Sequence, residues 1–246
     1  MSTSIIYPGK VMTKGTLYLI PTPLAEGPPE AVLPAGTLEV IRRLDRFIVE
    51  EVRTARRFLI RAGVPAPIDR ITFLEFNEHS GPGEAEKCLE GLETGIDTGL
   101  LSEAGMPCVA DPGAQVVRMA REQGIRVVPL TGPSSLLLAL AASGFNGQSF
   151  CFRGYLPADK GLLVRRIREL ERAIAENDQT QIIIETPYRN LALFDALVKN
   201  CRPGTLLCIA SGITGNKESI RTLSIGEWKN NRPEIHKVPA IFLLYH

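Results

Sequence analysis

Long apolar runs are absent from this 246-residue sequence. The longest obvious one, LLLALAA at 136–142, is far shorter than the roughly 18 to 20 residues that span a bilayer. The first fourteen residues, MSTSIIYPGKVMTK, lack the apolar core and the small-residue cleavage site of a secretory signal. We therefore expect a cytoplasmic protein that does not enter a membrane.

Motifs for metals and for nucleotide phosphates are also missing. The five cysteines form no C-x-x-C pair, and the three histidines show no H-x-x-x-H spacing. We therefore expect free thiols and no bound metal. No G-x-x-x-x-G-K-[ST] loop occurs, and no G-x-G-x-x-G motif follows a predicted strand.

The first part of the chain alternates short apolar segments with amphipathic ones. Strands are predicted at 16–20, 46–51, 71–76, 98–103 and 125–130, and helices at 37–44, 53–62, 84–94, 113–123 and 134–143. An alternation of this kind predicts an α/β fold in which helices cover both faces of a mostly parallel sheet.

The stretch SGFNGQS at 143–149 gathers small and polar residues, which indicates a linker. We therefore expect an N-terminal α/β domain at 1–144 and a second domain at 145–246. In the second domain, strands are predicted at 150–156, 181–186, 205–210, 219–225 and 238–245, and helices at 161–177 and 189–199. No helix is predicted between the last two strands, so the sheet should be partly antiparallel and the domain mixed α/β.

Two loops at predicted strand ends are rich in residues that control the backbone. SEAGMPCVADPG and TGPSS each lead from a strand into a helix, and ligands of open α/β sheets bind outside the carboxyl ends of the strands. The glycines allow close approach or positive φ, Asp111 is suited to cap the next helix, and Pro112 to occupy its first turn. Either loop alone is ordinary turn chemistry, whereas the two together favour a site for a polar small molecule.

Basic residues concentrate in two stretches. Seven arginines lie between residues 42 and 61 (42, 43, 46, 53, 56, 57 and 61), and five basic residues lie between residues 160 and 172. Phosphate contacts dominate the affinity of proteins for nucleic acids, so either stretch is a candidate RNA-binding surface. Both are equally compatible with solvated helix faces.

Several segments, in this order, resemble the tetrapyrrole methylase superfamily. Within it they look most like the small-subunit ribosomal RNA 2′-O-ribose methyltransferases, and the resemblance covers nearly the whole chain. The segments are YLIPTP (18–23), LLSEAGMPCVADPG (100–113), IRVVPLTGPSSLLLALAASG (125–144), FRGYLP (152–157) and ETPYR (185–189), with IVEEVRTARRFL (48–59) and FNEHS (76–80) as weaker members.

The resemblance implies a homodimer that binds S-adenosylmethionine in a cleft between its two α/β domains. The cofactor-binding residues that it implies are Pro21, Thr22, Ser102, Glu103, Ala104, Gly105, Asp111, Pro112, Gly113, Thr131, Gly132, Pro133, Ser134, Ser135, Thr186 and Pro187. Methyl transfer from a sulfonium depends on alignment of the reacting atoms and requires neither a covalent nucleophile nor a metal.

An attacking ribose hydroxyl would still benefit from a base, for which Glu78, His79 and Glu103 are the candidates. For the first two the alternative is a surface turn, and Glu103 could instead accept hydrogen bonds from backbone amides. With ribosomal RNA as the partner, the expected footprint is formed by Arg53, Arg56 and Arg57.

Other hypotheses remain open because the chain departs from the RNA-modifying branch. The usual Gly-Asn-Leu after the first motif is replaced by Leu24, Ala25, Glu26 and Gly27. Tyr188 replaces a His, and the run 211–214 lacks an expected Arg–Glu pair. These departures spare most of the cofactor pattern and fall on loops expected to face the substrate. The acceptor could therefore be a tetrapyrrole or another small molecule, or the chain could bind the cofactor without catalysis. An α/β scaffold without any cofactor would require every one of these turn motifs to be coincidental.

Overall fold

A computed structural model of the chain describes residues 13–65 and 67–246. It divides into two compact units, the first running up to Thr22 and over Pro28–Gly132, the second comprising Pro23–Gly27 and Pro133–His246. The chain changes unit three times, each time at the bond before a proline: Pro23, Pro28 and Pro133. Proline fixes its own φ and restricts the residue before it, so each crossing is conformationally restrained.

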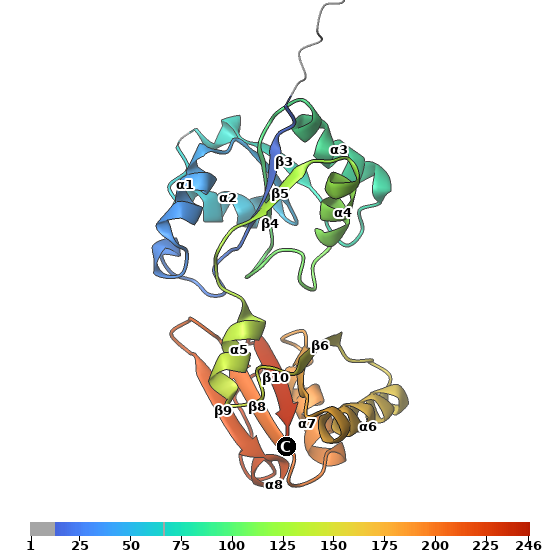
Figure 1. The fold of residues 1–246 in the computed structure, drawn as a ribbon. Coiled ribbons are helices and arrows are strands. Elements are labelled where there is room, and N and C mark those ends of the chain that lie inside the picture. Colours follow the sequence, from blue (N-terminus) through green and yellow to red (C-terminus); the bar gives the residue numbers. More distant parts are fainter. Residues whose placement is uncertain (1–12, 66) are drawn as a thin grey trace, which may run out of the picture. The chain divides into compact units, whose positions relative to one another are not determined.

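The first unit holds a five-stranded sheet in the order β3-β2-β4-β1-β5, with all neighbours parallel, as predicted (Figure 1). Its strands are β1 (Thr16–Ile20), β2 (Arg46–Val49), β3 (Thr72–Glu75), β4 (Thr98–Leu101) and β5 (Arg126–Pro129). Its helices are α1 (Ala35–Arg43), α2 (Val52–Arg61), α3 (Pro82–Glu93) and α4 (Ala114–Glu122), with 3-10 turns at Pro29–Ala31 and Ile68–Arg70.

Alternation along the central strands divides the helices between the two faces of this sheet. Phe47 and Val49 of β2 pack in one core cluster with α1 and α2, whereas Ile48 packs in another with α3 and α4. Successive strand side chains point to opposite faces, so a buried three-residue run contributes to both cores. Helices therefore cover both faces, as expected for a parallel sheet.

The second unit holds a mixed five-stranded sheet in the order β6-β7-β10-β8-β9. Only β6 and β7 are parallel, whereas β10 is antiparallel to β7 and β8, and β9 is antiparallel to β8. Its elements are α5 (Ser135–Ser143), β6 (Phe150–Tyr155), α6 (Lys160–Asn177), β7 (Thr180–Ile184), α7 (Asn190–Asn200), β8 (Leu206–Ser211), β9 (Ser219–Ser224), α8 (Ile225–Trp228) and β10 (Ala240–Tyr245). The predicted mixed sheet is thus confirmed.

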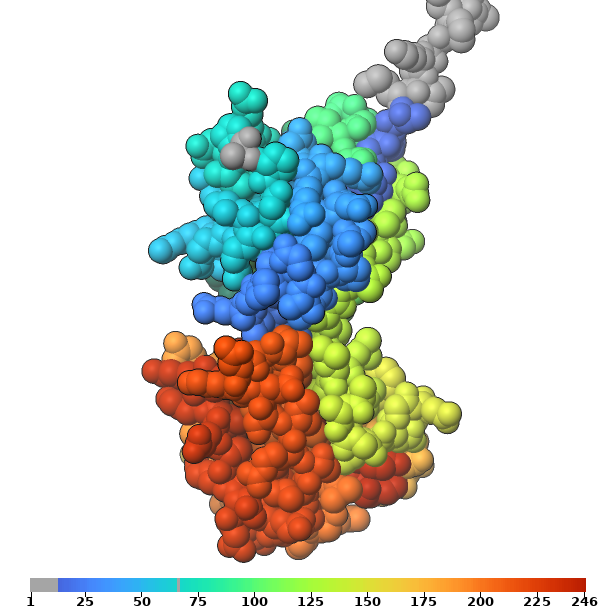
Figure 2. All heavy atoms as spheres, turned by 90° about the vertical axis from the view of Figure 1, so that its left-hand side faces the viewer, coloured from blue at the N-terminus to red at the C-terminus, as the bar shows by residue number. Residues whose placement is uncertain are grey.

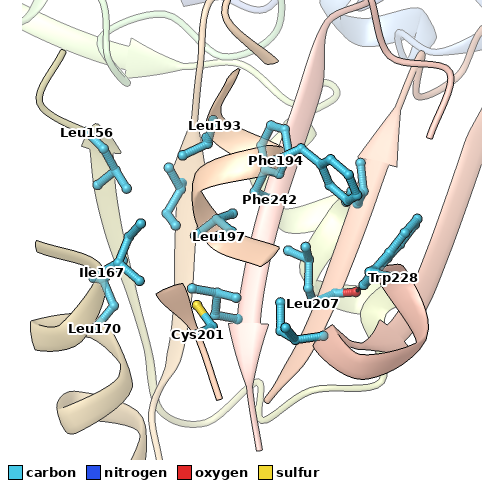
Figure 3. Close-up of a cluster of buried hydrophobic side chains, with 14 of the residues drawn as sticks. Leu156, Ile167, Leu170, Leu193, Phe194, Leu197, Cys201, Leu207, Trp228 and Phe242 are labelled. Atoms are coloured by element: carbon cyan, nitrogen blue, oxygen red, sulfur yellow. Dashed lines mark hydrogen bonds between the residues drawn. The ribbon is translucent and has the colours of Figure 1, made fainter. Parts of the chain in front are cut away.

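The helices of this unit also lie on two faces of their sheet. Helices α6, α7 and α8 contribute to one core, in which Trp228 packs edge-on against Phe194 (Figure 3). Helix α5 covers the other face with Ala139 and Leu140. The prediction of no helix between the last two strands was wrong, because α8 lies there; its Trp228 is 1% exposed and donates from Nε1 to the Leu207 carbonyl at 2.8 Å.

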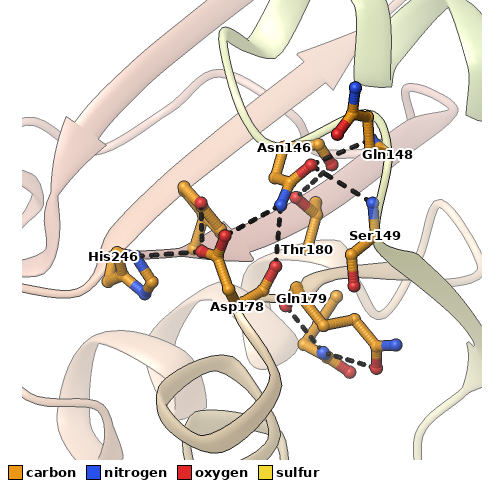
Figure 4. Close-up of polar contacts among 9 residues, drawn as sticks. Asn146, Gln148, Ser149, Asp178, Gln179, Thr180 and His246 are labelled. Carbon is orange, nitrogen blue, oxygen red and sulfur yellow. Dashed lines mark hydrogen bonds and ion pairs between the residues drawn. The ribbon is translucent and has the colours of Figure 1, made fainter.

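The division at Gly132 differs from the predicted boundary after residue 144, and the predicted linker at 143–149 belongs to the second unit. Helix α5 packs there, and Asn146 follows it (Figure 4). Oδ1 of Asn146 accepts from the amides of Gln148 and Ser149, and its Nδ2 donates to Asp178. The segment 143–149 is therefore a turn of the second unit that the hydrogen bonds of Asn146 stabilise. No helix in the described part of the chain is both long and apolar enough to cross a membrane.

Candidate functional site

The loops that follow β1 and β4 are joined at the carboxyl edge of the first sheet. Thr22 and Gly105 form a two-hydrogen-bond bridge, with N···O distances of 2.9 and 3.1 Å. Gly105 has φ +79°, which glycine adopts without a steric penalty. The bridge therefore brings the predicted segments Pro21–Thr22 and Ser102–Gly105 together at one place.

Both hydroxyl groups in this bridge face the backbone. The Thr22 Oγ1 donates to the Ser102 carbonyl at 3.2 Å, and the Ser102 Oγ donates to the Gly105 carbonyl at 2.9 Å. Both residues are buried. Their side chains therefore fix the shape of the loops, and any ligand contact from this bridge falls to main chain and to the exposed residues Glu103 and Ala104.

The loop after β5 packs directly on the loop after β1. A Cβ added at Gly132 would lie 2.2 Å from Cγ of Pro21 and 3.0 Å from Leu33. The preceding Thr131 is held by its carbonyl, which accepts a hydrogen bond from the Thr37 hydroxyl at 2.8 Å. Position 132 thus requires glycine because Pro21 packs directly against its Cα. Thr131 and Gly132 therefore lie at the same carboxyl edge of the first sheet as the Thr22–Gly105 bridge.

Asp111 and Pro112 precede α4 and do not begin it. The prediction of Asp111 as the N-cap was wrong: the N-cap is Gly113, whose amide donates to Asp111 Oδ1 at 2.7 Å. Because a Cβ at Gly113 would lie 2.8 Å from that oxygen, the turn needs glycine for space. Cys108 and Ala110 just before it have φ of +67° and +58°. Left-handed conformations in residues other than glycine store strain and cluster at functional sites.

The structure adds Glu50, which follows β2 and was not among the predicted site residues. Its Oε1 accepts from the Glu103 amide at 3.4 Å, and the carboxyl group of Asp111 is its neighbour. Burial, followed by a hydrogen-bonding interaction with Asp111 and the charge of that residue, raises the pKa of Glu50 to about 7. Its position directly after a buried strand of the same sheet was the available signal.

Glu103 lies beside Glu50 and faces α2. The Thr54 hydroxyl lies 3.1 Å from Glu103 Oε1 and 2.6 Å from Glu51 Oε2. Partial burial raises the pKa of Glu103, and the Thr54 hydrogen bond opposes this increase. Of the three predicted bases, Glu103 is thus the one that the structure places among the motif loops.

Glu78 and His79 lie in a surface turn after β3, an edge strand of the sheet. Their side chains are 82% and 86% exposed and lie 3.6 Å apart. The turn is closed locally, because the Asn77 side chain accepts from the His79 amide and the Ser80 hydroxyl accepts from the Asn77 amide. Neither side chain therefore joins the carboxyl cluster formed by Glu50, Glu103 and Asp111.

Helix α2 begins next to this cluster and carries the three predicted RNA-binding arginines. Glu51 caps the helix by accepting from the amides of Arg53 and Thr54. All three arginines are exposed; Arg56 pairs with Asp69 at 3.4 Å and lies over the Phe73 ring. Helices α1 and α2 lie on the left of the first unit in Figure 1. Figure 2 looks at this side, where blue to cyan atoms of this part of the chain lie on the surface.

The remaining predicted cofactor residues belong to the second unit. Thr186 and Pro187 follow β7; the Thr186 carbonyl accepts from the Arg189 amide, and the Pro187 carbonyl accepts from the Lys237 amide. Pro133 and Ser134 lead into α5, which begins at Ser135. Each of these segments therefore lies at the start of a helix, and Thr186 is exposed.

Within the described ranges, no group of three or more His, Cys, Asp or Glu side chains is placed to hold a metal ion. The five cysteines are free thiols, three of them buried. Burial raises the pKa of the Cys108 and Cys201 thiols to about 12, so these two groups are poor nucleophiles at neutral pH.

Comparison with known proteins gives relatives over almost the whole chain. Ribosomal RNA small subunit methyltransferase I of Haemophilus influenzae is 36% identical over 233 residues, which are 94% of this chain and 78% of the relative. The protein of the same name from Escherichia coli O157:H7 is 32% identical over 216 residues, covering 87% of this chain and 71% of the relative.

Solved structures share the fold at lower identity. The methyltransferase CobJ has a TM-score of 0.63 at 18% identity, with 95% of this chain and 94% of that chain covered. Uroporphyrin-III C-methyltransferase from Thermus thermophilus, in complex with S-adenosylhomocysteine, has a TM-score of 0.57 at 17% identity over 94% of this chain and 98% of that one. The model of the tetrapyrrole (corrin/porphyrin) methylases matches residues 18–228, and the chain therefore belongs to this family of methyltransferases, as its motifs predicted.

Proposed function

We propose that the chain transfers the methyl group of S-adenosylmethionine to a ribose hydroxyl of small-subunit ribosomal RNA. One observation carries the proposal: the strand-end loops that match the family signature meet at one sheet edge, beside the arginine-bearing helix α2. The names of the two bacterial relatives support ribosomal RNA as the acceptor. An RNA substrate also agrees with the cytoplasmic location expected from the sequence.

The residues at this edge fit the proposed cofactor. Asp111 Oδ2 is buried without a hydrogen-bond partner, and the carboxyls of Glu50 and Glu103 lie close by. Carboxyl groups of this kind favour a ligand that carries positive charge and polar hydrogens. When bound, S-adenosylmethionine supplies an activated methyl group on a sulfonium.

The chain's own contribution to the reaction is orientation and proton acceptance. Gly132 packs closely on Pro21, so the two loops present their main chain at the sheet edge in one fixed arrangement. A fixed arrangement of this kind can orient the bound cofactor for methyl transfer. Glu103 is the proposed proton acceptor, because its raised pKa is closer to neutrality than that of an ordinary glutamate and the Thr54 hydroxyl orients it. Glu78 and His79 are not retained in this role because they lie in the surface turn.

The proposal includes the residues of the second unit and a second copy of the chain. Thr186, Pro187 and the segment from Pro133 to Ser135 are proposed to complete the cofactor site. Helix α5 exposes Leu137 and Leu138, which are 57% and 39% accessible. Exposed apolar side chains on a helix are typical of an interface, which supports the proposed homodimer.

The test is methyl transfer with radiolabelled S-adenosylmethionine, using small ribosomal subunits and, separately, a tetrapyrrole extract as acceptors. We expect label in RNA, in a dinucleotide that resists alkali because its 2′ oxygen is blocked. Glu103→Gln should lower the rate by about 100-fold or more, whereas the matched control Glu78→Gln should match the parent. Label in the tetrapyrroles alone would change the acceptor, and binding without transfer to either would contradict the proposed enzyme.

A further inference from the structure

The carboxyl groups of Glu50 and Asp111 are neighbours, and within residues 13–65 and 67–246 neither forms an ion pair with a basic side chain. Asp111 Oδ1 accepts from the Gly113 amide at 2.7 Å, whereas its Oδ2 is buried and lacks a donor. Glu50 reaches Asp111 with its own carboxyl and accepts from the Glu103 amide through Oε1. A buried acceptor without a donor is unfavourable. If both carboxyl groups were ionised, neither could supply a donor to Asp111 Oδ2.

A single proton resolves this arrangement. Two carboxylates within hydrogen-bonding distance cannot both ionise without strong repulsion, and one of the two therefore keeps its proton. A neutral Glu50 is a donor and Asp111 Oδ2 is the acceptor that needs one. The bond so formed is charge-assisted and stronger than one between neutral groups.

We propose that Glu50 is a positioning residue that shares one proton with Asp111 and thereby holds the Asp111–Gly113 turn against the ends of β2 and β4. This turn follows the left-handed residues Cys108 and Ala110, so it needs contacts from outside to keep its shape. That the turn binds S-adenosylmethionine rests on the proposed function, whereas the shared proton does not.

The surroundings of Glu50 set the sign of the pH dependence. Two charged groups face it, Asp111 from the loop before α4 and Glu103 from the end of β4; burial and both carboxylates favour its neutral form, with a pKa of about 7. Beyond them, Glu51 and Arg57 of α2 face Glu103, and Cys108 faces Asp111. The folded-state pKa is raised, so the bond is present at low pH and is lost as the pH rises through about 7.

The first experiment needs no ligand. In the full chain labelled with ¹³C at its carboxyl groups, the Glu50 signal should titrate near pH 7, and Asp111→Asn should move its midpoint towards that of an ordinary glutamate. Glu75→Gln is the matched control, because Glu75 ends the neighbouring strand β3 and is exposed. An ordinary midpoint in the parent, or one that Asp111→Asn leaves unchanged, overturns the proposal.

The second experiment measures S-adenosylhomocysteine binding by calorimetry from pH 5.5 to 8.5. The parent should lose about tenfold in affinity across this range. Glu50→Gln should bind with little pH dependence, because its amide donates at every pH, and Glu50→Ala should bind weakly throughout. Parent-like binding by Glu50→Ala overturns the positioning role. If no variant binds but Glu50 titrates as expected, the shared proton stands and the proposed function fails.

Discussion

The two units treat their buried polar groups differently. In the described residues, three buried side-chain atoms of the first unit lack a hydrogen-bond partner, on Arg46, Asp111 and Gln123, against one in the second, on Asn190. In the second unit, buried Glu171 accepts from the Arg202 amide at 2.7 Å and from the Thr205 hydroxyl at 2.6 Å. Glu171 thus serves the structure of the second unit, whereas Asp111 Oδ2 has no N–H or O–H donor from the main chain or from a neutral side chain of the described residues.

Sheet topology explains part of this difference. Five parallel strands send all their carboxyl ends to one edge, where the loops after β1, β2, β4 and β5 collect. In the mixed sheet, β10 runs opposite to β7 and β8, and β9 runs opposite to β8, so the carboxyl ends of the strands are divided between both edges. A parallel sheet therefore concentrates loop amides and carboxylates in one place, where ligands bind.

The largest effect is expected from Gly132→Ala in the first unit. The added Cβ would lie 2.2 Å from Pro21 Cγ, so the two loops must move apart, and overpacking of this kind costs about 1–3 kcal/mol. S-adenosylhomocysteine affinity should fall by roughly 100-fold, measured by calorimetry. The matched control is Gly36→Ala, at a position in α1 where a Cβ has nothing within 4 Å. Parent-like affinity in Gly132→Ala would separate this loop from the binding site.

A smaller effect of the opposite kind is expected from Glu171→Ala in the second unit. It leaves the Arg202 amide and the Thr205 hydroxyl without their acceptor, which lowers the free energy of unfolding by about 2 kcal/mol. Urea unfolding followed by the fluorescence of Trp228, the one tryptophan of the chain, reports directly on this unit. The affinity for the cofactor should stay unchanged. A loss of affinity as large as that expected for Glu50→Ala would show that buried polar groups of the second unit also support cofactor binding, and would contradict the comparison.

Hydrophobic periodicity predicted almost every strand and helix, because each sheet has two buried faces and its strands are short apolar runs. The boundary was missed because small polar residues at 143–149 look like a linker, whereas tertiary contacts tie them to the second unit: Asn146 donates to Asp178, and the Ser143 carbonyl accepts from the Thr222 hydroxyl. Pro23, Pro28 and Pro133, at the points where the chain passes between the units, can be read from the sequence. A proline alone does not indicate that the segments on its two sides belong to different units.

At the motif edge, composition alone could not separate Glu50 from Glu51. The two are adjacent, yet Glu51 caps α2 and has a lowered pKa, whereas Glu50 turns towards Asp111 and has a raised one. The difference arises from the end of β2 at Val49 and its pairing with β4. Such contacts depend on sheet order, which periodicity does not encode.

The smallest effect sharpens the comparison between the basic helices of the two units. Arg53 and Arg57 of α2 and Arg168 and Arg172 of α6 are exposed pairs with the same spacing. Reversing either pair to glutamate changes the net charge equally, so non-specific attraction to RNA should fall equally. Only a contact made by α2 itself would separate the two variants.

We expect Arg53→Glu with Arg57→Glu to weaken ribosomal RNA binding about tenfold and to reduce the slope of log affinity against log salt by about 1.4, because two phosphate contacts and their released counterions are lost. The α6 pair should keep the parent's slope. Filter binding across a salt series measures both quantities. An equal loss of slope in both variants would place RNA on both units, and an unchanged slope in the α2 variant would remove α2 from the footprint while leaving the carboxyl cluster as the site.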